Sequence, residues 1–194
     1  ELDQKNYFKD DLRLILKNSD STELAKVKTI FKFVQDKMNW NRHYGYSTDK
    51  GVNKAYTEGI GNVAEINFIL IAMLNYAGIN ANPVLCSTIG HGIPIYPNRT
   101  VFNYVVVAAD VDEKRVLLDA TNKYTAINIL PQHALNWMGR LIRRDNTSEE
   151  IALLPTTASK DQNNLIVSID ATGKIKGKLR KQRTDYEALR FRET

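Results

Sequence analysis

Two stretches of the chain carry hydrophobic patterns that are typical of helices. Apolar residues recur at helical spacing over Leu24–Met38, directly after Asp20–Glu23, which offers an N-cap with a glutamate three residues on. This pattern predicts an amphipathic helix. The stretch Ile66–Ala77 is apolar on nearly every side, which predicts a helix that is buried all round, and Gly78 stands where a left-handed C-cap belongs.

Strand patterns follow the second helix. Val101–Ala109 is almost continuously apolar, which predicts a strand buried on both faces, and Lys114–Thr121 returns after the turn Asp110–Glu113. The fold class is therefore α+β, with a buried central helix packed on an antiparallel sheet. The weaker expectations are a short helix or irregular lead-in over 7–17, loop over 41–61 with a helical turn at 52–56, a strand over 83–88, a short helix over 133–137 and a hairpin of 165–169 with 174–181.

These patterns divide the chain into three parts. Residues 1–145 hold the mixed helix and sheet core with its helical lead-in, and residues 146–163 have the composition of a linker. Residues 164–194 form a β-hairpin. Because the first residue is Glu1 and not Met, the chain is expected to be a piece of a longer protein.

The net charge of +5 is concentrated at one end. Eight cations and three anions lie in Lys174–Thr194, so this segment carries the whole net charge. The cations from Lys174 to Arg180 alternate with other residues, which is typical of a solvated strand face or a protected sheet edge. No aromatic residues are interleaved among them for base stacking, so nucleic acid is not the expected partner; an anionic partner for this hairpin stays open as a binding hypothesis.

The remaining composition excludes several kinds of site. Cys86 is the only cysteine, so an internal disulfide and a cysteine metal cage are both excluded. His43 and His133 have no second ligand at metal-binding spacing, so we expect neither a metal nor another cofactor. No apolar run is long enough for a transmembrane segment.

One buried carboxylate is expected in the sheet. Asp119 ends an otherwise apolar strand, and a buried carboxylate needs a partner. If the preceding turn is centred between Val111 and Asp112, Tyr104 lies directly opposite Asp119 on the same face. The Tyr104 hydroxyl is then the nearest candidate partner.

The order of short motifs resembles the transglutaminase-like core that is shared with papain-type cysteine proteases. The motifs are Gly61-Asn62-Val63 before the buried helix, Ala77-Gly78-Ile79-Asn80-Ala81 after it, Phe102-Asn103-Tyr104, and Leu117-Leu118-Asp119-Ala120-Thr121. The resemblance covers roughly residues 20–135 and implies a nucleophilic cysteine at the helix N-terminus, a histidine base and an aspartate. Leu130-Pro131 and the basic hairpin also resemble large bacterial envelope proteins, which implies a periplasmic or cell-envelope location and a flanking β-rich domain that starts at the hairpin.

This chain departs from the family pattern at two of the three catalytic positions. Val63 stands at the position of the cysteine and Tyr104 at that of the histidine, and only Asp119 matches. Valine offers no nucleophile, and a phenol with a pKa near 10 is a poor general base. We therefore expect a pseudoenzyme without catalytic residues, with a structural role or with a protein, peptide or glycan in its degenerate cleft.

Several residues are candidates for lining that cleft. They are Trp40, Asn62, Val63, His91, Tyr104 and Asp119. For Trp40, and for Tyr44 and Tyr46 nearby, packing on the core is the favoured interpretation. The alternative hypothesis is an active hydrolase or acyl transferase that uses Cys86, or Tyr104 beside Asp119, although Cys86 within a strand is typical of a small buried hydrophobe. Glu65, in the first turn of the buried helix, is explained by the helix dipole.

Overall fold

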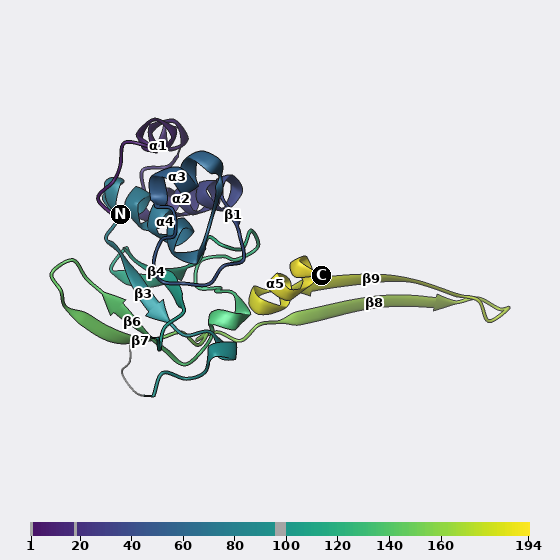
Figure 1. Cartoon of the computed structure of the whole chain (residues 1–194). Coiled ribbons are helices and arrows are strands. Elements are labelled where there is room, and N and C mark those ends of the chain that lie inside the picture. Colours follow the sequence, from purple (N-terminus) through teal and green to yellow (C-terminus); the bar gives the residue numbers. More distant parts are fainter. Residues whose placement is uncertain (1, 18, 96–99) are drawn as a thin grey trace. The chain divides into compact units, whose positions relative to one another are not determined.

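A computed structural model describes residues 2–17, 19–95 and 100–194 of the chain (Figure 1). It contains two compact units, residues 1–154 and residues 155–194. The helices of the first unit are α1 (Lys9–Leu16), α2 (Glu23–Lys37), α3 (Val52–Glu58), α4 (Val63–Tyr76) and the short 3-10 turns η1 (Ile89–His91) and η2 (Gln132–Ala134). Among the described residues, no helix is long and apolar enough to span a membrane.

The first unit is built on a five-stranded antiparallel sheet in the order β5-β4-β3-β6-β7. Its strands are β3 (Ala81–Cys86), β4 (Tyr104–Val111), β5 (Lys114–Leu118), β6 (Met138–Ile142) and β7 (Ser148–Ala152). A separate parallel pair, β1 (Asn39–Trp40) with β2 (Ile60–Gly61), leads into α4. The α+β architecture expected from the sequence is confirmed.

Helix α4 packs against β3 and β4 on one side and against α2 and α3 on the other (Figure 1). Most of its residues are fully buried because its sequence has almost no polar face. The helix begins at Val63, three residues before the expected start, since Asn62 and Glu65 form a capping box. Its last turn is followed by Gly78, whose φ of 87° is left-handed, as the sequence predicts.

The prediction of a linker over residues 146–163 is wrong at both ends of this range. Ser148–Ala152 form β7, which pairs with β6 and completes the sheet. The hairpin of the second unit begins at Asp161 rather than at Leu165. The alternation of polar and apolar residues over β7 is too short to distinguish a strand from a loop by sequence. The strand forms because its partner β6 supplies the pairing contacts.

The β4–β5 turn also differs from the expected one. Val111 pairs with Lys114, so the turn consists of Asp112 and Glu113, which both have positive φ as a type I′ hairpin requires. Extending this register places Thr121, not Asp119, directly opposite Tyr104. The shift of two residues keeps every side chain on its expected face, so Tyr104 and Asp119 still share a face of the sheet.

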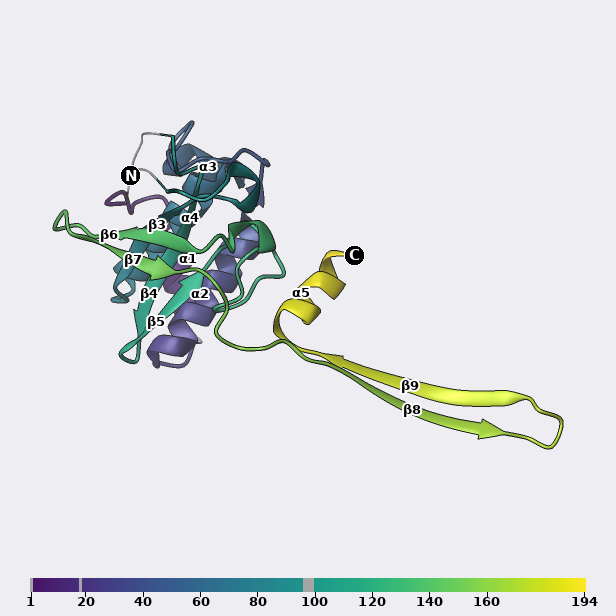
Figure 2. The same cartoon turned by 90° about the horizontal axis from the view of Figure 1, so that it is seen from below.

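The second unit consists of a long hairpin and a terminal helix (Figure 2). Strands β8 (Asp161–Ile169) and β9 (Ile175–Arg183) pair along their whole length, and α5 (Asp185–Glu193) follows them. Because β9 begins at Ile175, the cations that share one strand face are Lys176, Lys178 and Arg180; Lys174 lies in the turn.

Candidate functional site

The site that the sequence points to lies at the N-terminus of α4. Asn62 caps the helix: its Oδ1 accepts from the Glu65 backbone N–H at 2.8 Å. Val63 is therefore the first helical residue, and its backbone N–H donates to the carbonyl oxygen of His43 at 3.3 Å. The Val63 side chain is fully buried within a hydrophobic cluster that also contains Cys86 and Tyr104.

Glu65 organises the loop in front of the helix. Its Oε1 accepts backbone N–H groups from Asp49, Lys50 and Gly51 at 3.1, 2.7 and 3.1 Å, and its Oε2 accepts the N–H of Asn62 at 2.8 Å. The side chain is fully buried. The helix dipole alone is therefore an incomplete explanation of Glu65: this carboxylate is a buried anion held by four main-chain donors, and it ties residues 49–51 to α4.

Gly61 allows this arrangement because its backbone passes close to Glu65. A Cβ atom at this position would lie 3.0 Å from Cβ and 3.1 Å from Oε2 of Glu65, and 3.3 Å from Cβ of Ala55. Such distances are too short for unstrained packing. The glycine of the Gly61-Asn62-Val63 motif is thus explained by steric space beside the buried carboxylate.

Asp119 and Tyr104 form the second half of the site. The Tyr104 hydroxyl donates to Oδ2 of Asp119 at 2.7 Å, and Oδ1 accepts from the backbone N–H and the hydroxyl of Thr121 at 2.8 and 2.7 Å. Asn67 Nδ2 lies 3.4 Å from the same Oδ1. Because Asp119 is fully buried, these donors replace its solvation by water.

Asn67 connects α4 to the sheet, and sequence reasoning missed it. Its Nδ2 donates to the carbonyl oxygen of Val105 at 2.9 Å, and its Oδ1 accepts the N–H of Ala120 at 3.0 Å. The residue lies one helical turn after Val63 and is fully buried. The signal in the sequence was an amide inside the mostly apolar first half of α4, since a buried amide needs partners outside the helix.

The electrostatics of the site disfavour acid–base chemistry by Tyr104. Burial, and then the negative charge of Asp119, raise the pKa of Tyr104 well above its ordinary value. The phenol therefore stays protonated at neutral pH and acts as a hydrogen-bond donor.

Cys86 lies beside this pair but cannot readily form a thiolate. It is the direct cross-strand neighbour of Tyr104 in the β3–β4 pairing. Burial, and then the charge of Asp119, raise the pKa of the Cys86 thiol above its ordinary range. The thiol is thus near the carboxylate, but it is fully buried and protonated.

Aromatic rings cover the space beside Tyr104. The His133 ring lies 5.1 Å from the Tyr104 ring and stacks at 6.0 Å on Trp40, and Tyr44 lies 5.4 Å from Trp40 and 5.7 Å from His133, all between ring centroids. Trp40 Nε1 donates to the His43 carbonyl oxygen at 3.1 Å. Trp40 packs on the core, as favoured from the sequence, while half of the Tyr44 surface stays exposed.

His91 occupies a different position from the other candidates. It ends the 3-10 turn η1, is exposed, and its Nε2 lies 2.8 Å from the Thr100 carbonyl oxygen. Among the described residues, His133 is the histidine whose ring contacts Tyr104. The residues that the structure describes include no group of three or more His, Cys, Asp or Glu side chains that could bind a metal ion.

A sequence profile described as the transglutaminase-like superfamily matches residues 13–124, which include Val63, Tyr104 and Asp119. The chain belongs to the transglutaminase-like superfamily. No curated protein matches the sequence.

Two solved structures are similar in fold. One, from Parabacteroides distasonis, bears the name "putative protease": it is 18% identical with a TM-score of 0.55, and the match covers 79% of this chain and 29% of that one. The other, named a "putative cysteine protease" from Cytophaga hutchinsonii, is 11% identical with a TM-score of 0.47, covering 94% of this chain and 54% of that one. The chain thus spans about a third and about half of their lengths.

Proposed function

We propose that this domain is a catalytically inactive member of its superfamily. The observation that carries the proposal is the burial of the three positions that correspond to the catalytic residues. Val63, Tyr104 and Asp119 each have 0% of their surface exposed. A nucleophile has to be accessible to the substrate that it attacks. Here the corresponding side chains are part of the core.

The chemistry of these side chains supports the same conclusion. The family mechanism needs a thiolate that an imidazole activates, and the first residue of α4 is instead aliphatic. The phenol that replaces the imidazole donates its hydroxyl proton in a hydrogen bond to Asp119. Asp119 in turn is saturated by donors from Tyr104, Thr121 and Asn67, so the network stabilises the junction between α4 and the sheet.

The role that remains is structural or that of a binding domain. The Tyr44 ring lies 5.8 Å from the Tyr104 ring, and Tyr44 and Tyr46 keep 50% and 40% of their surface exposed, so an extended peptide or a glycan would meet aromatic surface there. A place within a larger bacterial envelope protein is part of the proposal, and it rests on the resemblance of the motifs. Nucleic acid is not proposed as a partner.

A second candidate function is an active hydrolase or acyl transferase with relocated groups. The neighbourhood of Cys86, Tyr104 and Asp119 is the observation that favours it. It requires Cys86 to become accessible and to ionise, whereas the thiol is buried and its pKa is raised. We therefore place it second.

The experiment that separates the two combines turnover with thiol labelling. The inactive domain is expected to show no amine incorporation, deamidation or peptide hydrolysis, and Cys86 is expected to react with iodoacetamide only after unfolding in urea. Turnover that Asp119→Ala or Cys86→Ala abolishes would establish the enzyme instead. Labelling of Cys86 in the folded protein, with an apparent thiol pKa well below 8, would also support the enzyme.

A further inference from the structure

A groove of about 430 Å³ runs along α1, away from the degenerate catalytic positions. Its lining residues are Lys9, Leu12, Arg13, Leu16, Lys17, Tyr76 and Ala77. The first five come from α1 and its C-cap Lys17, and the last two are the final residue of α4 and its C-cap. All of them belong to the first unit.

Three cations border this groove in a regular row. Lys9, Arg13 and Lys17 are four residues apart, so they lie on one face of α1 at intervals of about 6 Å. Among the residues that the structure describes, no acidic residue lines the groove. Arg13 forms an ion pair of 3.7 Å with Asp10, and both side chains are highly exposed. This pair therefore neutralises little of the Arg13 charge.

The floor of the groove is apolar and recessed. Leu12 is almost fully buried, and Leu16 and Ala77 are partly buried. Tyr76 is 45% exposed and has two cations near its ring: Lys9 of the row, with Nζ at 5.9 Å from the ring centroid, and one further cation, Lys5, with Nζ at 5.8 Å.

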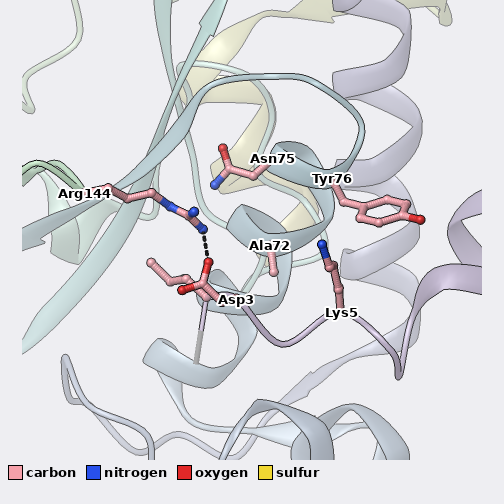
Figure 3. A pocket seen from close by; sticks show the side chains of 7 residues that line it. Asp3, Lys5, Ala72, Asn75, Tyr76 and Arg144 are labelled. Carbon is pink, nitrogen blue, oxygen red and sulfur yellow. Dashed lines mark ion pairs between the residues drawn. The ribbon is translucent and has the colours of Figure 1, made fainter.

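Tyr76 also borders a second, smaller pocket of about 150 Å³, in which Lys5 lies beside the tyrosine ring (Figure 3). There Arg144 forms an ion pair of 2.7 Å with Asp3. The charge of Arg144 is thus compensated within the domain, whereas the residues that line the α1 groove are cationic, aliphatic or aromatic. The two pockets meet at Tyr76, and the row of three cations lies on the α1 side of this residue.

We propose that this groove binds an acidic amphipathic helix of a partner protein. A helix that lies along α1 presents carboxylates four residues apart at the same interval as the three cations. Its apolar side chains insert between α1 and Tyr76, where the floor is recessed. This is helix-in-groove recognition, with the charge row setting the orientation and the apolar floor providing the buried area.

The shape of the surface favours a helix over an anionic membrane. Binding to a membrane surface needs apolar side chains that project beyond the cations, as in amphipathic membrane helices. Here the apolar side chains between α1 and Tyr76 lie below the cations. Leu14, which does project, lies about 100° around α1 from Arg13.

The test uses a fluorescein-labelled peptide of about 18 residues, with leucines on one helical face and glutamates four residues apart beside them. Fluorescence anisotropy is expected to show saturable binding to the full chain that weakens with added salt. The variant Lys9→Glu/Arg13→Glu/Lys17→Glu is expected to weaken binding at least tenfold, by about 1.4 kcal/mol or more. Tyr76→Ala, which keeps the charge row, is expected to weaken it as well. Circular dichroism confirms that each variant is folded.

The control variant Lys28→Glu/Lys54→Glu/Lys114→Glu changes the net charge equally at exposed sites outside the groove. It is expected to retain the binding of the parent chain. Equal weakening by both triple variants would overturn the proposal, because net charge alone would then explain the binding. Equal binding of a scrambled peptide, no binding at all, or binding only to phosphatidylglycerol vesicles would overturn it too.

Discussion

The hydroxyl of Tyr104 donates a 2.7 Å hydrogen bond to Oδ2 of Asp119, and both side chains are fully buried. By the resemblance of the motifs, we propose that these two positions correspond to the histidine and the aspartate of the superfamily. Here the same two positions hold a phenol and a carboxylate whose hydrogen bond joins β4 to the segment after β5. The pair is therefore expected to contribute to stability, and substitutions in and around it should be read first as changes in the free energy of unfolding.

Tyr104→Phe removes one donor from the Asp119 carboxylate without changing the ring. The variant is expected to lose about 1–3 kcal/mol of unfolding free energy, because a buried acceptor is left with one partner fewer. Urea unfolding followed by fluorescence measures the loss. Tyr124→Phe, on a 48% exposed side chain, is the matched control and should stay within about 0.5 kcal/mol of the parent. Equal losses for the two variants would contradict the prediction.

Glu65→Gln neutralises the anion that four backbone N–H groups share. We expect a loss of about 2 kcal/mol or more, since charge-assisted bonds are weakened and the new amide N–H₂ faces a donor. Hydrogen exchange of the Asp49, Lys50 and Gly51 amides is expected to accelerate. Glu113→Gln, in the exposed β4–β5 turn, should change neither quantity. Unaltered exchange at residues 49–51 would show that Glu65 does not order the loop.

Gly61→Ala places a methyl group against the Glu65 side chain. Contacts of 3.0–3.3 Å force the carboxylate or the neighbouring backbone to move, at an expected cost of about 1–3 kcal/mol. Gly90→Ala is the comparison, because a Cβ there meets no atom within 4 Å and the residue does not have a left-handed φ. Thermal unfolding measures both. A Gly61→Ala melting temperature equal to that of Gly90→Ala would refute the steric account.

Stability is expected to decline at alkaline pH. The pKa of Cys86 is raised in the folded chain by burial, so above about pH 8.5 the unfolded chain loses a proton that the folded chain keeps. The folded state then binds more protons than the unfolded state, and stability falls as pH rises. Relative to Cys86→Ala, the parent should lose about 1.4 kcal/mol per pH unit between pH 9 and 10, and nothing below pH 7.5. A constant difference across this range would mean that Cys86 titrates normally.

Restoring a thiol at the start of α4 tests whether the catalytic position is reachable. In a Cys86→Ala background, the Val63→Cys thiol is expected to react with iodoacetamide much more slowly than a Tyr124→Cys thiol, because Val63 is fully buried and Tyr124 is exposed. Mass spectrometry of timed samples gives the two rates. Similar rates would show that the position opens to solvent, and the proposal of an inactive, covered site would then lose its main support.

The buried helix and the main hairpin could be predicted from local patterns. The continuous apolar surface of α4 and the Gly78 cap follow from residue types alone. The pairing of Tyr104 with Asp119 was expected from a register that is two residues off, and the contact survives since side chains alternate with a period of two. A shift of one residue would have removed it.

Other parts of the site depend on contacts between distant residues. Glu65 accepts from residues 49–51, and Asn67 bonds Val105 and Ala120, far along the chain. The periodicity of the sequence does not predict such hydrogen-bond partners, because each partner depends on which elements meet after folding. The strand β7 and the stacking of His133 on Trp40 belong to the same class.

The sequence by itself determined what Val63 and Tyr104 can offer: a valine carries no nucleophile and a phenol no base near neutral pH, whatever surrounds them. It also determined that a helix without a polar face has to be buried. Only the tertiary structure decided that Val63, Tyr104 and Asp119 are closed to solvent, that Cys86 lies beside them with a raised pKa, and that four main-chain donors hold Glu65. Burial and electrostatic environment are properties of the packed neighbourhood, and that neighbourhood is assembled from segments that the local sequence does not connect.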